Sequence, residues 1–123
     1  MNKKHTIIIA NDSKNEAQYL ETILNSKGYK TLLATSGKEC LELAASTQVS
    51  LALIDGILPD YSGLEILKRL KRNKKTAHIP IIYYTALENN NLTIEALRNG
   101  ADDFIIKSNN FEELALRIQI QIN

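Results

Sequence analysis

Hydrophobic residues along this chain follow two alternating patterns. Short apolar runs, several rich in isoleucine, alternate with longer segments in which apolar residues recur every three or four positions. The first pattern predicts β-strands and the second predicts amphipathic helices. Strands are expected at residues 6–10, 29–34, 51–54, 79–84 and 103–106.

Helix starts are indicated by a serine or asparagine followed three residues later by glutamate. Such pairs are typical of helix N-termini, because the first side chain accepts a hydrogen bond from the backbone N–H three residues on. They occur at Ser13/Glu16, Ser36/Glu39, Ser62/Glu65 and Asn110/Glu113. A further short helix with Leu92, Ala96 and Leu97 is expected after the polar run at residues 89–91. Gly28 and Gly100 are placed to end helices.

Five strands that alternate with five helices predict a parallel sheet covered by helices on both faces, since right-handed crossovers place them there. A chain of 123 residues fits one domain with a single core. We therefore expect a (βα)5 sandwich built on a five-stranded parallel sheet, as one domain over residues 1–123.

The stretch SLALIDGILPDYSGLEIL, residues 50–67, sets Asp55 at the end of an apolar run. A continuous apolar run bounded by turn residues is typical of a strand buried on both faces. Its single acid would then lie at the carboxyl end of the strand, where open α/β sheets bind ligands.

Polar residues also follow the other predicted strands. Asn11 and Asp12 come after the first strand, Thr85 after the fourth and Lys107 after the fifth. In a parallel sheet these residues and Asp55 meet at one edge, where carboxylates suit Mg²⁺ and where lysine and a hydroxyl suit a phosphoryl group. Solvated loop ends with an incidental Asp55–Lys107 ion pair are the alternative.

Composition excludes several other classes of protein. The 15 basic and 14 acidic side chains give a net charge of +1, which argues against direct nucleic-acid binding. No apolar run approaches the roughly 20 residues of a membrane span, and the N-terminus does not resemble a signal peptide. We expect a cytoplasmic protein, in which the single Cys40 is a small buried hydrophobe.

Four segments together resemble the receiver domain of two-component response regulators. They are ND after the first strand, LIDGILPDYSGLEIL around Asp55, IIYYTA at the fourth strand and GADDFIIKS at the fifth. The resemblance implies a flavodoxin-like fold with Asp55 as phosphoacceptor. It implies Mg²⁺ held by Asp12, Asp55 and the backbone carbonyl of Ile57. Asn11 stands where the family usually has an acid, and its amide oxygen can still bind a water that coordinates the metal.

The resemblance also assigns roles in signalling. Asp55 would take a phosphoryl group from a sensor histidine kinase or a histidine phosphotransfer protein, with Thr85 and Lys107 contacting that group. Thr85 and Phe104 would act as the switch, although Phe104 is equally well explained as a core aromatic. The domain would be a phosphoacceptor that assists its own phosphorylation and dephosphorylation rather than an enzyme acting on a separate substrate.

A partner surface is expected on the fourth helix, the fifth strand and the fifth helix, which receivers use for homodimers or output domains. On the last helix, Leu116 and Ile120 lie opposite the core face formed by Leu114 and Ile118. Scattered exposed apolar residues are the alternative. We expect no output domain within this chain.

Several positions depart from the usual receiver pattern. Asn11 replaces an acid, which predicts weaker Mg²⁺ binding. Ser108 replaces the proline after the lysine, and a cis bond before a non-proline residue costs about 2.5 to 4 kcal/mol, so we expect a trans bond and a displaced lysine. Ile57 and Leu87 flank the expected path of the hydrolytic water without hydrogen-bonding groups, which predicts slow self-dephosphorylation.

Two other functions remain open from the sequence. A pseudo-receiver that binds partners without transferring phosphate is supported by Asn11 and Ser108, whereas the retained Asp12, Asp55, Thr85 and Lys107 argue against it. A flavin- or nucleotide-binding domain, or a related phosphatase, would need a phosphate-cradling loop or a nucleophilic acid after the first strand. The segment IIIANDSKN has neither.

Overall fold

Five parallel strands form one sheet in the order β2-β1-β3-β4-β5. The computed structural model describes residues 4–86, 90–108 and 110–122. The strands are β1 (Thr6–Ala10), β2 (Lys30–Ala34), β3 (Leu51–Asp55), β4 (Ile81–Thr85) and β5 (Asp103–Ile106). The predicted fold class, a flavodoxin-like (βα)5 sandwich, is confirmed.

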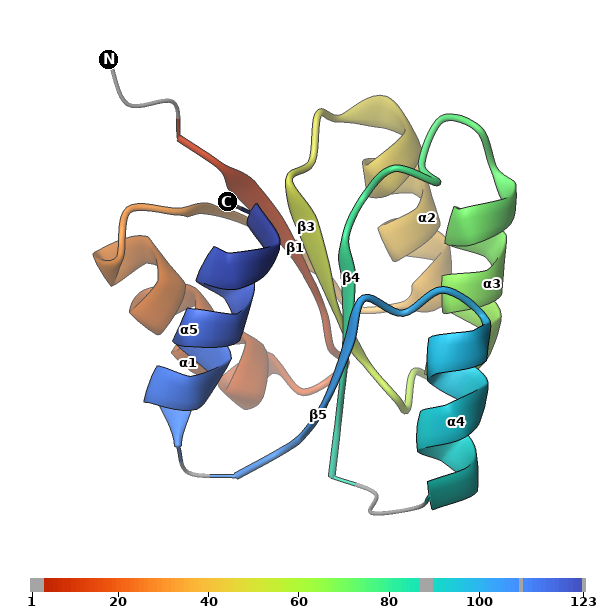
Figure 1. Ribbon diagram of the computed structural model, residues 1–123. Coiled ribbons are helices and arrows are strands. Elements are labelled where there is room, and N and C mark those ends of the chain that lie inside the picture. The colour runs from red at the N-terminus through yellow and green to blue at the C-terminus, as the bar shows by residue number, and fades with distance from the viewer. Residues whose placement is uncertain (1–3, 87–89, 109, 123) are drawn as a thin grey trace.

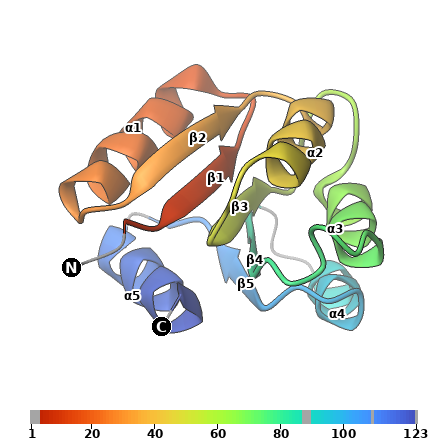
Figure 2. The ribbon, with the colours of Figure 1, turned by 90° about the horizontal axis from the view of Figure 1, so that it is seen from above.

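The helices cover both faces of the sheet, as Figures 1 and 2 show. Helices α1 (Lys14–Ser26) and α5 (Phe111–Ile122) lie on one face, and α2 (Gly37–Ser46), α3 (Gly63–Arg72) and α4 (Asn90–Arg98) lie on the other. Strand β2 lies on one side of β1, and β3 lies on the other side. The direction of the strand order therefore reverses between β1 and β3. Ligands of open α/β sheets bind at this kind of switch point, outside the carboxyl ends of the strands.

Strand β3 is buried along its whole length, which explains its continuous apolar sequence. Alternate residues of the central strands enter two clusters, with Ile8 and Ile54 packing beneath α2, α3 and α4, and Ile7 and Leu53 beneath α1 and α5. Asp55 is therefore the polar end of a strand whose other residues are all fixed in the core.

All four predicted helix caps form. The backbone N–H of the glutamate donates to the capping side chain at 3.3 Å for Ser13, 3.1 Å for Ser36, 3.1 Å for Ser62 and 3.2 Å for Asn110. Gly28 and Gly100 end helices with φ of 94° and 102°, a conformation that side chains disfavour.

Some predicted boundaries and core positions differ from the structure. The second strand begins at Lys30 rather than at 29, because the Tyr29 N–H bonds the Leu24 carbonyl at the end of α1. The fourth strand begins at Ile81 rather than at 79, because the Ile79 N–H bonds the Thr76 carbonyl in a turn. The third strand extends to Asp55. In α3, Ile66 is buried and Leu64 only partly so, and in α4 Leu97 is half exposed.

The loop after β3 is fastened to the start of α2 by Asp60. Its carboxylate accepts hydrogen bonds from the backbone N–H groups of Gly37 at 2.7 Å and Lys38 at 2.9 Å. These donors belong to the first turn of α2, where an acceptor and a negative charge are favourable. Asp60 thus connects the segment that follows Asp55 to a neighbouring helix.

Two further sequence predictions concern Cys40 and membrane-spanning helices. Cys40 is fully buried, as predicted, and burial raises the pKa of its thiol to about 12. Within the described ranges, no helix is long and apolar enough to cross a membrane.

Candidate functional site

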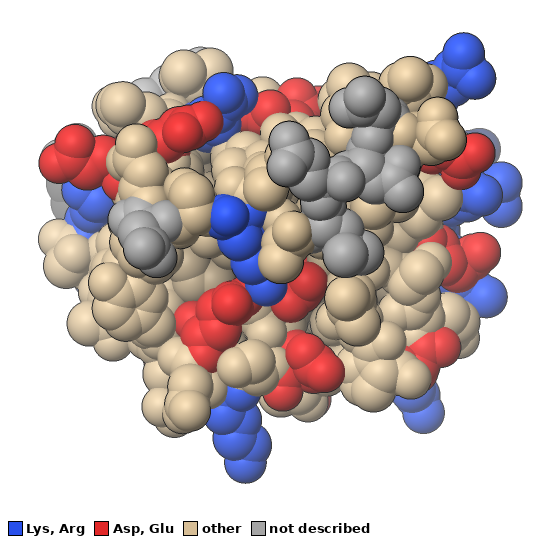
Figure 3. Space-filling view, turned by 90° about the horizontal axis from the view of Figure 1, so that it is seen from below, with Lys and Arg blue, Asp and Glu red and all other residues tan. Residues whose placement is uncertain are grey.

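The carboxyl ends of the strands gather polar side chains at one edge of the sheet. Asn11 and Asp12 follow β1, Asp55 ends β3, Thr85 ends β4 and Lys107 follows β5. Figure 3 views this edge from below, where acidic side chains lie around a basic one near the centre of the face. Of the predicted polar residues, Asn11, Asp55 and Lys107 are joined in one hydrogen-bonded network.

Asp55 is the last residue of β3 and is 9% exposed. One carboxylate oxygen, Oδ1, accepts from the Ile57 backbone N–H at 3.2 Å, and Oδ2 accepts from the Lys107 ammonium at 2.9 Å. These two hydrogen bonds fix the orientation of the Asp55 carboxylate at the end of β3.

Lys107 reaches the site from a trans-bonded chain. No peptide bond among the described residues is cis, so the expected trans bond between Lys107 and Ser108 is confirmed. The Lys107 backbone N–H donates to the Thr85 carbonyl at 2.7 Å, which continues the sheet hydrogen bonding past the end of β5. The absent proline therefore does not prevent the ammonium from reaching Asp55.

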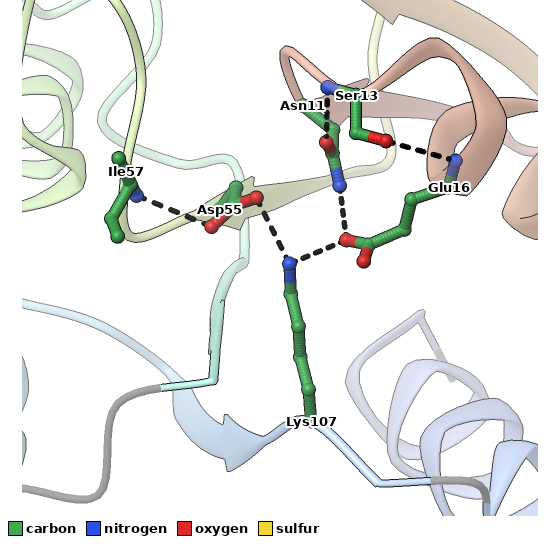
Figure 4. A network of polar contacts seen from close by, with 6 residues as sticks. All are labelled: Asn11, Ser13, Glu16, Asp55, Ile57 and Lys107. Carbon is green, nitrogen blue, oxygen red and sulfur yellow. Dashed lines mark hydrogen bonds and ion pairs between the residues drawn. The ribbon is translucent and has the colours of Figure 1, made fainter.

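The Lys107 ammonium bridges two carboxylates, those of Asp55 and Glu16 (Figure 4). Burial by itself lowers the pKa of the ammonium, but hydrogen bonds and charge from Glu16 and Asp55 outweigh burial and raise it above its ordinary value. The ammonium also lies 5.4 Å from the centre of the Tyr84 ring. Lys107 is consequently fully charged at neutral pH.

Glu16 is a site residue that sequence reasoning missed. It was predicted only as part of the helix cap at Ser13, yet its carboxylate also accepts hydrogen bonds from the Asn11 amide and from Lys107. The Asn11 carbonyl oxygen in turn accepts from the Ser13 backbone N–H at 2.8 Å. The only sequence signal was its place in the first turn of the helix that follows Asn11.

A hollow of about 230 Å³ opens beside Lys107 and Glu16. Its other walls are Tyr84, Ser108 and Phe111, and Phe111 packs edge-on against Tyr19 of α1 with ring centres 4.7 Å apart. The Lys107–Glu16 pair thus borders an opening between α1 and α5 and is reachable from solvent.

The residues that could hold a divalent cation supply oxygen atoms only. Asp55 is in place, whereas the Asp12 side chain is exposed. Across the described ranges, no group of three or more His, Cys, Asp or Glu residues is placed to hold a metal ion. Mg²⁺ needs only one or two carboxylates and keeps several waters, so Asp12, Asp55 and the Ile57 carbonyl suit it chemically.

The expected switch residues lie beside Asp55. Thr85 is buried, and a Cβ at Gly56 would come within 2.8 Å of its hydroxyl oxygen. Phe104 is half-buried and stacks on Tyr83, with ring centres 5.2 Å apart and planes 8° from parallel. Burial and then the charge of Asp55 raise the pKa of Tyr83. The Phe104 ring is thus one aromatic contact away from the Asp55 loop.

The remaining predicted residues are exposed or lie outside the described ranges. Ile57, whose backbone N–H bonds Asp55, is 58% exposed, and Leu87 lies outside the described residues. Leu116 and Ile120 are 59% and 70% exposed on the outer side of α5, as the sequence predicts. Leu116 also lines a groove toward Lys27 and Tyr29 on the side of α1.

Comparison with known proteins identifies the class. The response regulator receiver domain family matches residues 7–119 of this chain. The chain therefore belongs to the response regulator receiver domains.

Curated relatives agree with this family. The chain is 36% identical over 116 residues to the response regulator ArlR of Staphylococcus saprophyticus, covering 94% of this chain and 51% of the relative. It is 37% identical over 112 residues to the response regulator SaeR of Staphylococcus aureus, covering 91% and 48%. The chain thus spans about half the length of these relatives, and it aligns with 8% of a histidine kinase of Formosa agariphila.

Solved structures have the same fold. The receiver domain of the Francisella response regulator 1452 superposes with a TM-score of 0.89 at 30% identity, covering 97% of each chain. A two-component response regulator from Clostridium difficile gives 0.90 at 28% identity, covering 97% of this chain and 96% of that one. The response regulator protein TrrA from Thermotoga maritima, in complex with Mg²⁺-BeF, gives 0.86 at 28% identity, covering 95% and 98%.

Proposed function

We propose that this receiver domain accepts a phosphoryl group on Asp55 and thereby switches a surface that binds partners. The single observation that carries the proposal is the setting of Asp55, a fixed carboxylate at the end of a buried strand with the Lys107 ammonium 2.9 Å away. A nucleophile of this kind needs to be anionic, exposed on one side and close to a cation that can take up charge on the incoming group.

The chemistry is a transfer between two side chains. A carboxylate oxygen of Asp55 attacks the phosphorus of a phosphohistidine, the P–N bond breaks, and the imidazole leaves with the bonding pair. Lys107 and the Thr85 hydroxyl complement the phosphoryl oxygens. Asp12, Asp55 and the Ile57 carbonyl, with Asn11 through a water, would hold Mg²⁺, which would supply positive charge to offset repulsion between the anionic carboxylate and the anionic donor.

The expected partners are a sensor histidine kinase or a histidine phosphotransfer protein in the cytoplasm. The output surface comprises α4, β5 and α5, where Ile94, Ile106, Leu116 and Ile120 are exposed. This surface would bind a second copy or an output domain. When Thr85 moves toward the phosphoryl group, it leaves space that the Phe104 ring enters. The equilibrium between the inactive and active conformations shifts because the phosphoryl group makes different contacts in each.

A pseudo-receiver is the second candidate, supported by one feature of the site. The Asn11 side chain is neutral where receivers usually carry an acid, and the Lys107 ammonium already pairs with two carboxylates. Such a domain would bind its partner through the same surface without phosphate.

The test is intact mass after incubation with acetyl phosphate and Mg²⁺. The proposal predicts a gain of one phosphoryl group that is absent in Asp55→Asn. Asp60→Asn is the matched control, since Asp60 is a nearby exposed acid whose carboxylate binds the start of α2. A folded wild-type protein that gains no mass, beside a receiver with two acids that does, would favour the pseudo-receiver.

A further inference from the structure

Glu16 behaves differently from the other glutamates at equivalent helix positions. Glu39 turns back to accept the Thr35 backbone N–H at 2.8 Å, and Glu65 and Glu113 pair with arginines one turn along their own helices. Glu16 instead extends across the sheet edge to Asn11 and to Lys107, which is 91 residues away in sequence (Figure 4). Capping therefore does not explain the direction of its side chain.

The contact with Asn11 places a negative charge beside a position that lacks one. The Asn11 amide is 2% exposed and donates to the Glu16 carboxylate, so the two side chains form one polar unit. With Asp12 and Asp55, this brings the number of carboxylates around the edge to three. A receiver with two acids after its first strand has the same number.

The contact with Lys107 divides one ammonium between two carboxylates. Lys107, Glu16 and Asp55 have side chains 18%, 34% and 11% exposed, so their interactions are only partly screened by water. Without Glu16, the ammonium would pair with Asp55 alone and would compete more strongly with a cation for that carboxylate.

We propose that Glu16 is a positioning residue that replaces the missing acid at position 11. It adds a third negative charge beside the cation site rather than a third ligand, and it draws the Lys107 ammonium partly away from Asp55. This inference rests on the proposed function to the extent that Mg²⁺ is the cation the site takes. Both effects raise the affinity of the site for Mg²⁺.

The experiment measures Mg²⁺ affinity without any phosphoryl donor. Mg²⁺ is titrated into the protein while the amide resonance of Ile57, whose N–H donates to Asp55, is followed by NMR. Glu16→Gln keeps the shape and removes the charge, and it is expected to weaken binding about three- to tenfold. Glu65→Gln is the matched control, since it removes the same charge from the same helix position, and it should leave the affinity unchanged.

A charge-relocation variant separates this role from a structural one. Asn11→Asp added to Glu16→Gln returns the lost charge to the site and should recover most of the affinity. The inference is overturned if Glu16→Gln binds Mg²⁺ as tightly as the wild type, or if the double variant recovers no Mg²⁺ affinity. Either result leaves the proposal that Asp55 is the phosphoacceptor unaffected. A wild-type protein that binds no Mg²⁺ would overturn it together with the proposed Mg²⁺ site.

Discussion

At the scale of single residues, the site depends on which way long side chains turn. Asp55 and Lys107 were predictable, because each directly ends or follows an apolar strand and parallel strands share an edge. Glu16 was not, since Ser13 and Glu16 form a helix-start pattern that also occurs where the glutamate stays on its helix. The backbone N–H of Glu16 donates to the Ser13 hydroxyl as predicted, whereas its carboxylate accepts a hydrogen bond from Lys107.

The prediction about Asn11 is changed by this contact. Considered alone, Asn11 predicts weak Mg²⁺ binding that Asn11→Asp should strengthen. With the Glu16 carboxylate hydrogen-bonded to the same side chain, the carboxylate introduced by Asn11→Asp would face a like charge. The gain in Mg²⁺ affinity from Asn11→Asp is therefore expected to be smaller when Glu16 is present than in Glu16→Gln.

Ile57 controls the lifetime of the phosphoryl group in this account. It lies two residues after Asp55 and is 58% exposed, and its side chain has no hydrogen-bonding group that could orient a water. Ile57→Asn should shorten the lifetime several-fold by hydrogen-bonding the attacking water. Decay of the phosphorylated mass after removal of acetyl phosphate measures this, with Ile57→Val as the apolar control. Equal lifetimes for all three proteins would refute this role.

At the scale of elements, the sequence predicts types better than ends. Strands β1 and β5 have the expected bounds, because polar or turn residues flank both. The start of β4 was misplaced because Ile79 is apolar and buried although its N–H closes a turn on Thr76. Periodicity likewise cannot decide between Leu64 and Ile66 in α3, which depends on how the helix is rotated against the sheet.

Asp60 provides a test of how the loop after β3 is held. Asp60→Ala removes the acceptor for the first N–H groups of α2 and should lower the melting temperature at pH 7. Those hydrogen bonds, that of Lys38 first, hold the pKa of Asp60 below its ordinary value. The stabilisation is therefore complete above the ordinary carboxyl pKa of about 3.9 and is lost as the pH falls through the lower folded-state value.

Thermal unfolding of the wild type and Asp60→Ala from pH 7 down to about pH 2.5 measures this dependence. The difference in melting temperature should shrink through the acidic end of the range. Glu42→Ala, which removes an exposed acid from α2 itself, is the control and should show no such change. A difference that stays constant with pH would mean that Asp60 acts without its charge.

At the scale of the whole molecule, topology unites residues far apart in sequence. The alternation of strands and helices, together with right-handed crossovers, was enough to predict one edge that carries Asn11, Asp55, Thr85 and Lys107. The sequence could not predict that Phe104 would stack on Tyr83, since that contact depends on the register between β4 and β5. This stack connects β5 to Tyr83, whose ring lies next to Gly56 in the Asp55 loop.

Occupation of Asp55 is expected to change the surface of α4, β5 and α5. The direct test adds Mg²⁺ and beryllofluoride, a phosphoryl mimic, and follows backbone amide resonances by NMR. A phosphorylation-driven switch predicts shifts at Asp55 and Ile57 that extend to Phe104 and to Leu116 and Ile120 on α5, and none of these in Asp55→Asn. Shifts confined to the sheet edge, or no shifts in the wild type, would contradict a phosphorylation-driven switch.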